Sequence, residues 1–140
     1  MTDLSNVELV RSICTPWERG EFFSAEWAHP EIEFVLADGP DPGSWRGVAA
    51  MGEATVKRVR AWEAYHFEIE DYRPLDNERV LALTRRHGRG KTSGVEIGQF
   101  GTKGAWIFHV RDGQITRLVG YFVRDRALAD LGLTPEGDAR

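Results

Sequence analysis

The chain has 140 residues, 41 % of them apolar and 29 % charged, with a net charge of −4 and a single cysteine, a composition typical of one globular domain. Its acidic balance disfavours binding to nucleic acid, and it has neither an apolar run of about 18 residues for a membrane helix nor the segments of a signal peptide. The lone cysteine excludes an internal disulfide and is typical of a reducing compartment, so we expect a cytoplasmic protein.

Two helices, a strand and a long loop are expected in the first third of the chain. Apolar residues at helical spacing predict a helix over residues 5–20, and Pro16 should kink or end it. The apolar face of this helix consists of Val7, Val10, Ile13, Cys14 and Trp17. We expect a short helix over 22–28, a strand over 31–36, and a loop over 38–44, where turn-forming residues are dense.

Another helix and then several strands follow. The helix is expected over 48–62, with an apolar face that holds Val48, Met51, Thr55, Val59 and Trp62. Alternating polar and apolar residues predict a strand over 66–71 with one solvated face, and a further strand begins at Val80. The last two strands flank Asp112-Gly113, a pair that favours the positive φ angles of a tight hairpin turn. Helices that precede the strands indicate an α+β fold.

Both faces of the closing hairpin are apolar. Counting outward from the turn, Trp106 faces Val119 and shares its face with Tyr121. His109 and Leu118 then lie on the other face. Because an antiparallel sheet with one solvated face should show a polar side, we expect a partner subunit or another part of the chain to cover the second face. A bulge would exchange the two faces, since a slip of one residue inverts every side chain.

Several short motifs, taken in order, carry a family resemblance. They are Asn6-Val-Glu-Leu-Val-Arg11, Arg19-Gly20-Glu21, Trp45-Arg-Gly47, the stretch from Arg85 to Glu96, Val110-Arg-Asp-Gly113, and Tyr121 followed by Arg126 to Gly132. Their order and spacing resemble the SnoaL-like branch of the nuclear transport factor 2-like superfamily. The resemblance implies a single domain over residues 1–140, in which a curved antiparallel sheet forms a cone around three N-terminal helices, with a short C-terminal helix. It also implies a deep apolar pocket and a homodimer packed through the sheet.

The superfamily includes isomerases, dehydratases, epoxide hydrolases, polyketide cyclases and binding proteins, and the fold alone does not choose among them. Steroid-isomerase chemistry needs a tyrosine and a protonated carboxylic acid, and this chain has Ile13 and Trp106 at the corresponding places. Epoxide hydrolysis and SnoaL-type cyclisation use a carboxylate on the final strand. Residues 115–123 contain no Asp or Glu, and Val123 stands where SnoaL-like sequences often have Asp.

Four residues are candidate acid–base or oxyanion groups: Asp38, Arg85, His87 and Tyr121. An aspartate before glycine more often forms a local turn, which is the alternative role of Asp38. Arg85 and His87 share one face of their strand, where they would contact a substrate oxygen if that face is inward, or solvent if it is outward. Leu81 and Leu83 lie on the same strand face as Arg85 and favour the inward orientation of that face. Val80, Ala82 and Thr84 lie on the opposite face and argue against it.

The aromatic residues predict a flat, apolar ligand. Those expected to line the cone are Trp17, Phe34, Trp45, Trp62, Trp106 and Phe108, with core packing as their alternative role. Because the histidines lie far apart and no Cys-x-x-Cys pair occurs, we expect no metal and no cofactor. The sequence therefore predicts a small-molecule-binding SnoaL-like protein or, alternatively, a cofactor-independent lyase, isomerase or hydrolase that acts on a small apolar or aromatic substrate. A protein-binding adaptor is the third hypothesis.

Overall fold

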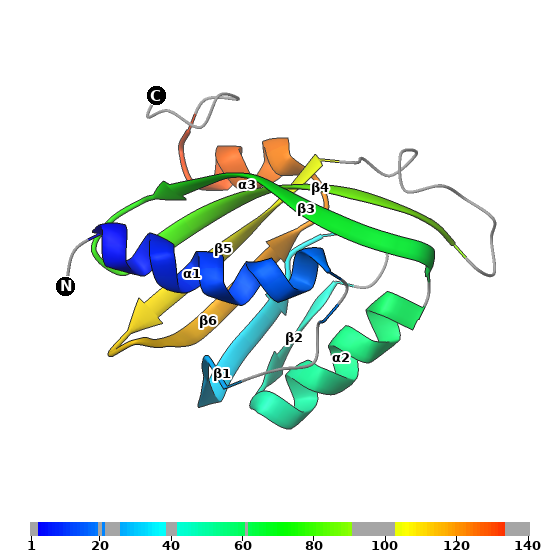
Figure 1. Cartoon of the computed structure of the whole chain (residues 1–140), viewed down its shortest axis with the longest axis horizontal. Helices are drawn as coiled ribbons and strands as arrows, with labels where there is room; N and C mark the ends of the chain where they lie inside the picture. The colour runs from blue at the N-terminus through cyan, green and yellow to red at the C-terminus, as the bar shows by residue number, and fades with distance from the viewer. Residues whose placement is uncertain are drawn as a thin grey trace.

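The fold is a single mixed sheet with helices on both faces (Figure 1). A computed structural model describes residues 3–19, 21, 26–38, 42–60, 62–90 and 103–133, with only the backbone for residues 3–5, 58–60, 62–67 and 87–90. The elements are α1 (Asp3–Glu18), β1 (Ala28–Leu36), β2 (Gly43–Arg46), α2 (Val48–Arg60), β3 (Trp62–Pro74), β4 (Arg79–Gly90), β5 (Lys103–Arg111), β6 (Gln114–Tyr121) and α3 (Arg124–Asp130). In this part of the chain, no helix is both long and apolar enough to cross a bilayer.

The six strands of the described residues are ordered β2-β1-β6-β5-β4-β3 in a curved, open sheet. Neighbouring strands are antiparallel except β1 and β6, which run parallel. The expectation of a purely antiparallel sheet was therefore wrong at this pair. The chain between β1 and β6 forms a long crossover, which a parallel pair requires.

The helices follow the predicted apolar pattern with shifted ends. The apolar stripe of α1 is buried, as predicted, and Pro16 lies two residues before the helix ends at Glu18. The predicted helix over 48–62 is α2, but it ends at Arg60, and Trp62 begins β3. Most of the expected helix over 22–28 lies outside the described residues, and its last residue, Ala28, begins β1 instead.

The loop expected over 38–44 is shorter than predicted. Gly43 and Ser44 belong to β2, where they pair with Leu36 and Val35 of β1. The turn-forming residues of this stretch did not distinguish the loop from the strand that follows it. Within the described residues, α1 precedes the strands, α2 lies between β2 and β3, and α3 follows β6 as the expected short C-terminal helix.

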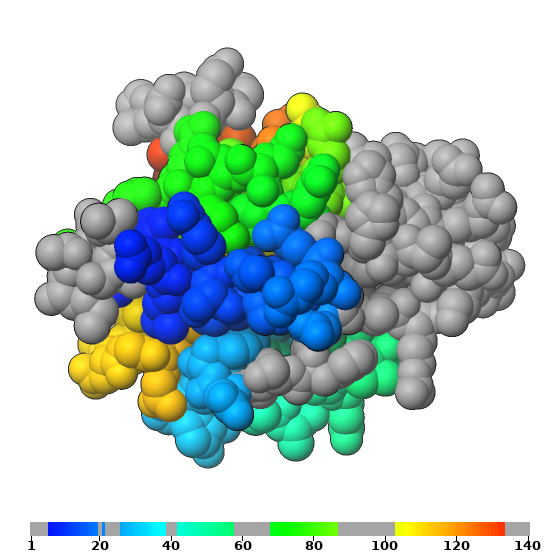
Figure 2. All heavy atoms as spheres, in the orientation of Figure 1, coloured from blue at the N-terminus to red at the C-terminus, as the bar shows by residue number. Residues whose placement is uncertain are grey.

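The two sheet faces carry two separate apolar clusters. The larger one lies under α1 and α2, where it contains Val10, Ile32, Met51, Val80, Ala82, Trp106, Phe108 and Leu118. The smaller one lies under α3, where it contains Leu81, Leu83, Ala105, Ile107, Val119, Tyr121 and Leu128. We expected either a partner subunit or another part of the chain to cover the second apolar face. Within the chain, α3 packs on this face. Figure 2 shows α1 across the middle of the first face, between β3 and β1.

The closing hairpin has the predicted turn but a different register. Arg111 pairs with Gln114, and Asp112 and Gly113 have φ angles of 52° and 75°. The register then shifts, because His109 pairs with Arg117 and leaves Thr116 as an extra residue in β6. This bulge exchanges the faces of all later residues. The prediction that Trp106 faces Val119 and shares a face with Tyr121 was therefore wrong.

Candidate functional site

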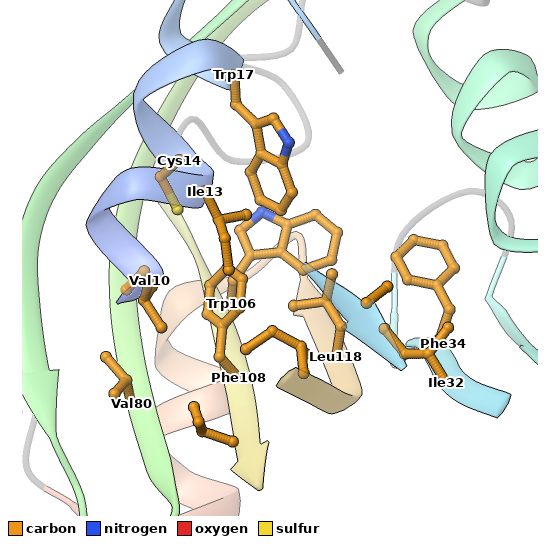
Figure 3. Packing of buried hydrophobic residues seen from close by; sticks show 14 of the residues in the cluster. Val10, Ile13, Cys14, Trp17, Ile32, Phe34, Val80, Trp106, Phe108 and Leu118 are labelled. Carbon is orange, nitrogen blue, oxygen red and sulfur yellow. The ribbon is translucent and has the colours of Figure 1, made fainter. Parts of the chain in front are cut away.

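A continuous row of aromatic rings lies between α1 and the sheet (Figure 3). Trp17 of α1 packs on Phe108 at 5.8 Å between ring centroids and on Trp106 at 6.0 Å. Trp106 in turn stacks on Phe34 at 5.9 Å with an interplanar angle of 20°. Such pairs contribute about 0.5–1.5 kcal/mol each beyond their buried area. Trp106 therefore contacts both Trp17 of α1 and Phe34 of β1, and it joins the two halves of the row.

The row reaches the surface at both ends. At one end, Trp27 meets Trp17 edge to face at 5.8 Å. At the other, Trp45 of β2 lies 5.8 Å from Phe34. Trp27 and Trp45 are partly exposed, whereas the rings between them are buried. The row therefore offers aromatic surface at its ends and rigid, packed rings behind it.

Gly120 makes room for the central ring. Its register partner in β5 is Trp106, and a Cβ atom built at Gly120 would lie 2.5 Å from Cζ3 of that indole. Real Cβ atoms essentially never approach another heavy atom so closely. The bulge at Thr116 is what places this glycine opposite Trp106, so the position of the ring depends on the shifted register.

Two polar residues of β4 face the same side as the aromatic row. Val80 and Ala82 belong to the larger cluster, and the alternation of a strand puts Thr84 and Arg86 on that face too. Thr84 is fully buried and Arg86 is 4 % exposed. The sequence did not single out this pair, because Leu81 and Leu83 made the opposite face of the strand an equally apolar candidate. The available signal was the small or apolar side chains of Val80 and Ala82, which share a face with Thr84 and Arg86.

Backbone oxygens of β6 and the residue after it hold the Arg86 guanidinium. Its Nη2 donates to the carbonyl of Phe122 at 2.6 Å, its Nη1 donates to that of Tyr121 at 3.4 Å, and its Cζ lies 4.1 Å from the centroid of the Phe122 ring. A Cβ atom at Gly104 would overlap Nη1 and would lie 3.1 Å from Thr84 Oγ1. The absence of a side chain at Gly104 therefore leaves the space in which the guanidinium and the hydroxyl converge.

The Thr84 hydroxyl is buried and has no hydrogen-bond partner among the residues that the structure describes. A hydroxyl in that state costs free energy that a methyl group of the same shape would not. Buried polar groups in native proteins are nearly always paired, so each exception needs an explanation. Packing alone therefore does not explain why position 84 holds a threonine and not a valine.

The Asp38 carboxylate is bound to backbone. Its Oδ1 accepts from the Phe122 N–H at 2.5 Å and its Oδ2 from the Val123 N–H at 3.2 Å. These contacts hold the end of β1 against the start of α3. The local turn expected as the alternative role of Asp38 would involve residues 39–41, which lie outside the described residues.

Tyr121 lies on the α3 face, in the smaller cluster. Its hydroxyl donates to Asp130 Oδ2 at 2.9 Å. Burial, followed by this hydrogen bond, raises the pKa of Tyr121 to about 12, and the charge of Asp38 contributes in the same direction. Tyr121 does not join the aromatic row, because it lies on the opposite face of the sheet.

Arg85 shares the α3 face with Leu83, opposite to Thr84 and Arg86. Its Nη2 is 3.3 Å from Glu70 Oε2, and Glu70 also pairs with Arg124. The side chains of His87 and Trp62 lie outside the described residues, although their backbones pair with His66 and Gly90. The structure thus gathers five of the six predicted ligand-binding aromatics in one row, and it does not bring Arg85 or Tyr121 to that row.

The model of the SnoaL-like domain family matches residues 23–118. This match covers more than half of the sequence and includes β1 to β5 with part of β6. The protein belongs to the SnoaL-like domain family. The predicted resemblance is confirmed. No curated protein matches the sequence of this SnoaL-like chain.

Solved structures with the same fold cover nearly the whole SnoaL-like chain. An NTF2-like protein from Burkholderia thailandensis superposes with a TM-score of 0.69 at 18 % identity, over 92 % of this chain and 97 % of its own. A proposed polyketide cyclase from Xanthomonas campestris gives a TM-score of 0.62 at 21 % identity, over 91 % and 98 %. A protein of ketosteroid isomerase-like fold from Catenulispora acidiphila, in complex with trimethylamine, gives 0.62 at 14 % identity, over 92 % and 95 %. At these identities the likeness shows the fold.

Proposed function

We propose that this SnoaL-like protein binds a small, largely apolar organic molecule through its aromatic row. The ligand-binding residues of this proposal are Trp17, Phe34, Trp45, Trp62, Trp106 and Phe108. The observation that carries the proposal is the placement of Trp106, which packs between Trp17 and Phe34 and has a glycine opposite it. Sites for small organic molecules are mostly aromatic and aliphatic, with few polar groups.

The contacts of the candidate catalytic residues favour binding over catalysis. The Asp38 carboxylate accepts two backbone hydrogen bonds, the Tyr121 hydroxyl donates to Asp130, and Arg85 pairs with Glu70. Each of these groups therefore has a role in holding the fold. A catalytic acid or base must instead lie within hydrogen-bond reach of the reacting atom.

The second hypothesis is a cofactor-independent lyase, isomerase or hydrolase for a small apolar or aromatic substrate. It would use Asp38, Arg85, His87 and Tyr121 as acid–base or oxyanion groups. The hydrogen bond from the N–H of Phe122, the neighbour of Tyr121 in the chain, to the Asp38 carboxylate favours it, because it brings two of these residues close together. It predicts that Tyr121→Phe, which keeps the ring but removes the hydroxyl, abolishes turnover without loss of ligand affinity.

We also propose that two copies pair through the α3 face of the sheet. A row of ionisable side chains crosses this face on paired positions of neighbouring strands, from Glu33 through Arg117 and His109 to Arg79. Glu33 at one end and Arg79 near the other make the row complementary to a second copy in the reverse direction. Light scattering should give twice the monomer mass, and a monomer in dilute solution would contradict this interface.

Calorimetric titration with naphthamide, a flat neutral probe, tests the proposed binding function. We expect saturable binding at one site per chain, and at least a several-fold loss of affinity in Trp106→Phe, which shortens the ring that packs between Trp17 and Phe34. Val123→Ala is the matched control, because Val123 is exposed and lies outside the row. Failure of naphthamide and of its charged analogues to bind would refute the proposal.

A further inference from the structure

The polar end of the proposed binding site, on β4 beside Trp106, has features of a built site. Thr84 and Arg86 lie on the same face as Trp106, and both are at least nine-tenths buried. In the register of β4 and β5, Thr84 pairs with Gly104 and Ala82 pairs with Trp106. Two residues along a strand span about 7 Å, so Thr84 and the register partner of Trp106 lie about that far apart along β4. A ligand of two fused rings is long enough to span this separation.

The chemistry at this end selects a negatively charged oxygen. The Thr84 Oγ1 is buried with no partner in the described part of the chain, and a hydroxyl can donate to an oxygen acceptor. The Arg86 guanidinium, held in place by two carbonyls, gives this end a fixed positive charge. Hydrogen bonds to a charged acceptor strengthen in a buried site.

Three independent features keep this arrangement in place. Gly104 leaves the space for the guanidinium, the Phe122 ring lies against it, and the two carbonyls fix its orientation. A valine at position 84 would fill the same volume without an unpaired hydroxyl. A threonine there, beside a positioned cation, is explained by a ligand group that completes its hydrogen bonding.

We propose that the ligand of this protein is a small aromatic carboxylate, with its rings on the Trp106 side and its carboxylate at Thr84 and Arg86. This inference rests on the proposed binding function and names its ligand class. A carboxylate offers two oxygens, one for the hydroxyl and one for the cation. A cationic ligand is disfavoured here by Arg86, even though aromatic rings alone would attract it.

Three probes of the same shape test the inference by calorimetric titration of the full chain: naphthoate, naphthamide and naphthylmethylamine. We expect naphthoate to bind at least about ten-fold more tightly than naphthamide, and the amine to bind most weakly. Equal affinities for the three probes would overturn the inference and leave the proposed function standing. Absence of binding by all three would refute the proposed function itself.

Two variants at position 84 separate recognition from folding. Thr84→Val removes the hydroxyl and keeps the shape, and Thr84→Ser keeps the hydroxyl and removes a methyl group. We expect Thr84→Val to bind naphthoate about ten-fold more weakly and naphthamide as the unaltered protein does, whereas Thr84→Ser keeps the preference. If Thr84→Val keeps the full preference for naphthoate, the hydroxyl has no part in recognition and the inference is wrong.

Discussion

Gly120→Ala is expected to destabilise the protein by displacing the central ring of the aromatic row. A Cβ atom at this position would lie 2.5, 2.6 and 2.9 Å from three carbons of the Trp106 indole, all of them in its six-membered ring. An ordinary contact begins at 3.4 Å, so the ring or the strand must move by about 1 Å. The ring is rigid and packed on both sides by Trp17 and Phe34, so it has little room to rotate.

The expected loss follows from two opposing effects. Overpacking of a core typically costs about 1–3 kcal/mol. Replacing glycine by alanine also stabilises by about 0.4–1 kcal/mol through the unfolded chain, provided that the backbone angles suit alanine. The φ of Gly120 lies outside the positive range that disfavours alanine. The net change in the free energy of unfolding should therefore be a loss of roughly 1–2 kcal/mol, or a Tm lower by about 3–8 °C.

Chemical denaturation followed by circular dichroism measures this change, and Gly52→Ala is the matched control. Gly52 lies within α2, and a Cβ atom there meets nothing within 4 Å. Alanine in place of a helical glycine should stabilise the protein by about 0.5–1 kcal/mol. Replacing glycine by alanine is thus expected to stabilise the protein at position 52 and to destabilise it at position 120.

A double-mutant cycle identifies the ring as the cause. Trp106→Phe removes the six-membered portion of the indole that meets Gly120, so Gly120→Ala should cost less in that background. If Gly120→Ala is as stabilising as Gly52→Ala, or if its cost is the same with phenylalanine at position 106, the packing of Trp106 against β6 is wrong. The bulged register of the hairpin would be wrong with it.

Three further predictions concern single side chains. Thr84→Val should raise the free energy of unfolding by about 1 kcal/mol, because it removes a buried hydroxyl without a partner; a loss in thermal denaturation would contradict this. Burial, then Arg117 and Arg79, lowers the pKa of His109 below 6.5, so the unfolded chain binds the proton more tightly and stability should fall as pH drops below about 6.5. His109→Gln should flatten that part of the stability–pH curve, and an unchanged slope would count against it. Asp38→Ala should cost about 1–3 kcal/mol, with Asp38→Asn intermediate because its amide oxygen still accepts one backbone hydrogen bond; an Asp38→Ala protein as stable as the unaltered one would show that these bonds contribute nothing.

Local patterns in the sequence predicted the elements whose stability is local. Helical spacing identified the buried face of α1, since each of its apolar residues contacts the same side of the fold. The Asp112-Gly113 pair identified the hairpin turn because few other residues accept both φ angles. The aromatic residues at positions 17, 34, 45, 106 and 108 were correctly expected to lie together.

Features that depend on distant parts of the chain were not predictable in this way. The bulge at Thr116 has no signature in the neighbouring residues, yet it decides which side chains meet Trp106. The inward parity of β4 was ambiguous because Val80, Leu81, Ala82 and Leu83 are all buried, two on each face. Consequently, Arg85 was chosen in place of Arg86.

The position of a bound probe tests the central claim most directly. A crystal structure of the protein with naphthamide should show the probe in van der Waals contact with the aromatic row, at Trp106 or at the partly exposed Trp45. Binding on the α3 face, beside Tyr121 and Leu128, would contradict the account, because it would show that the aromatic row is only a packed core.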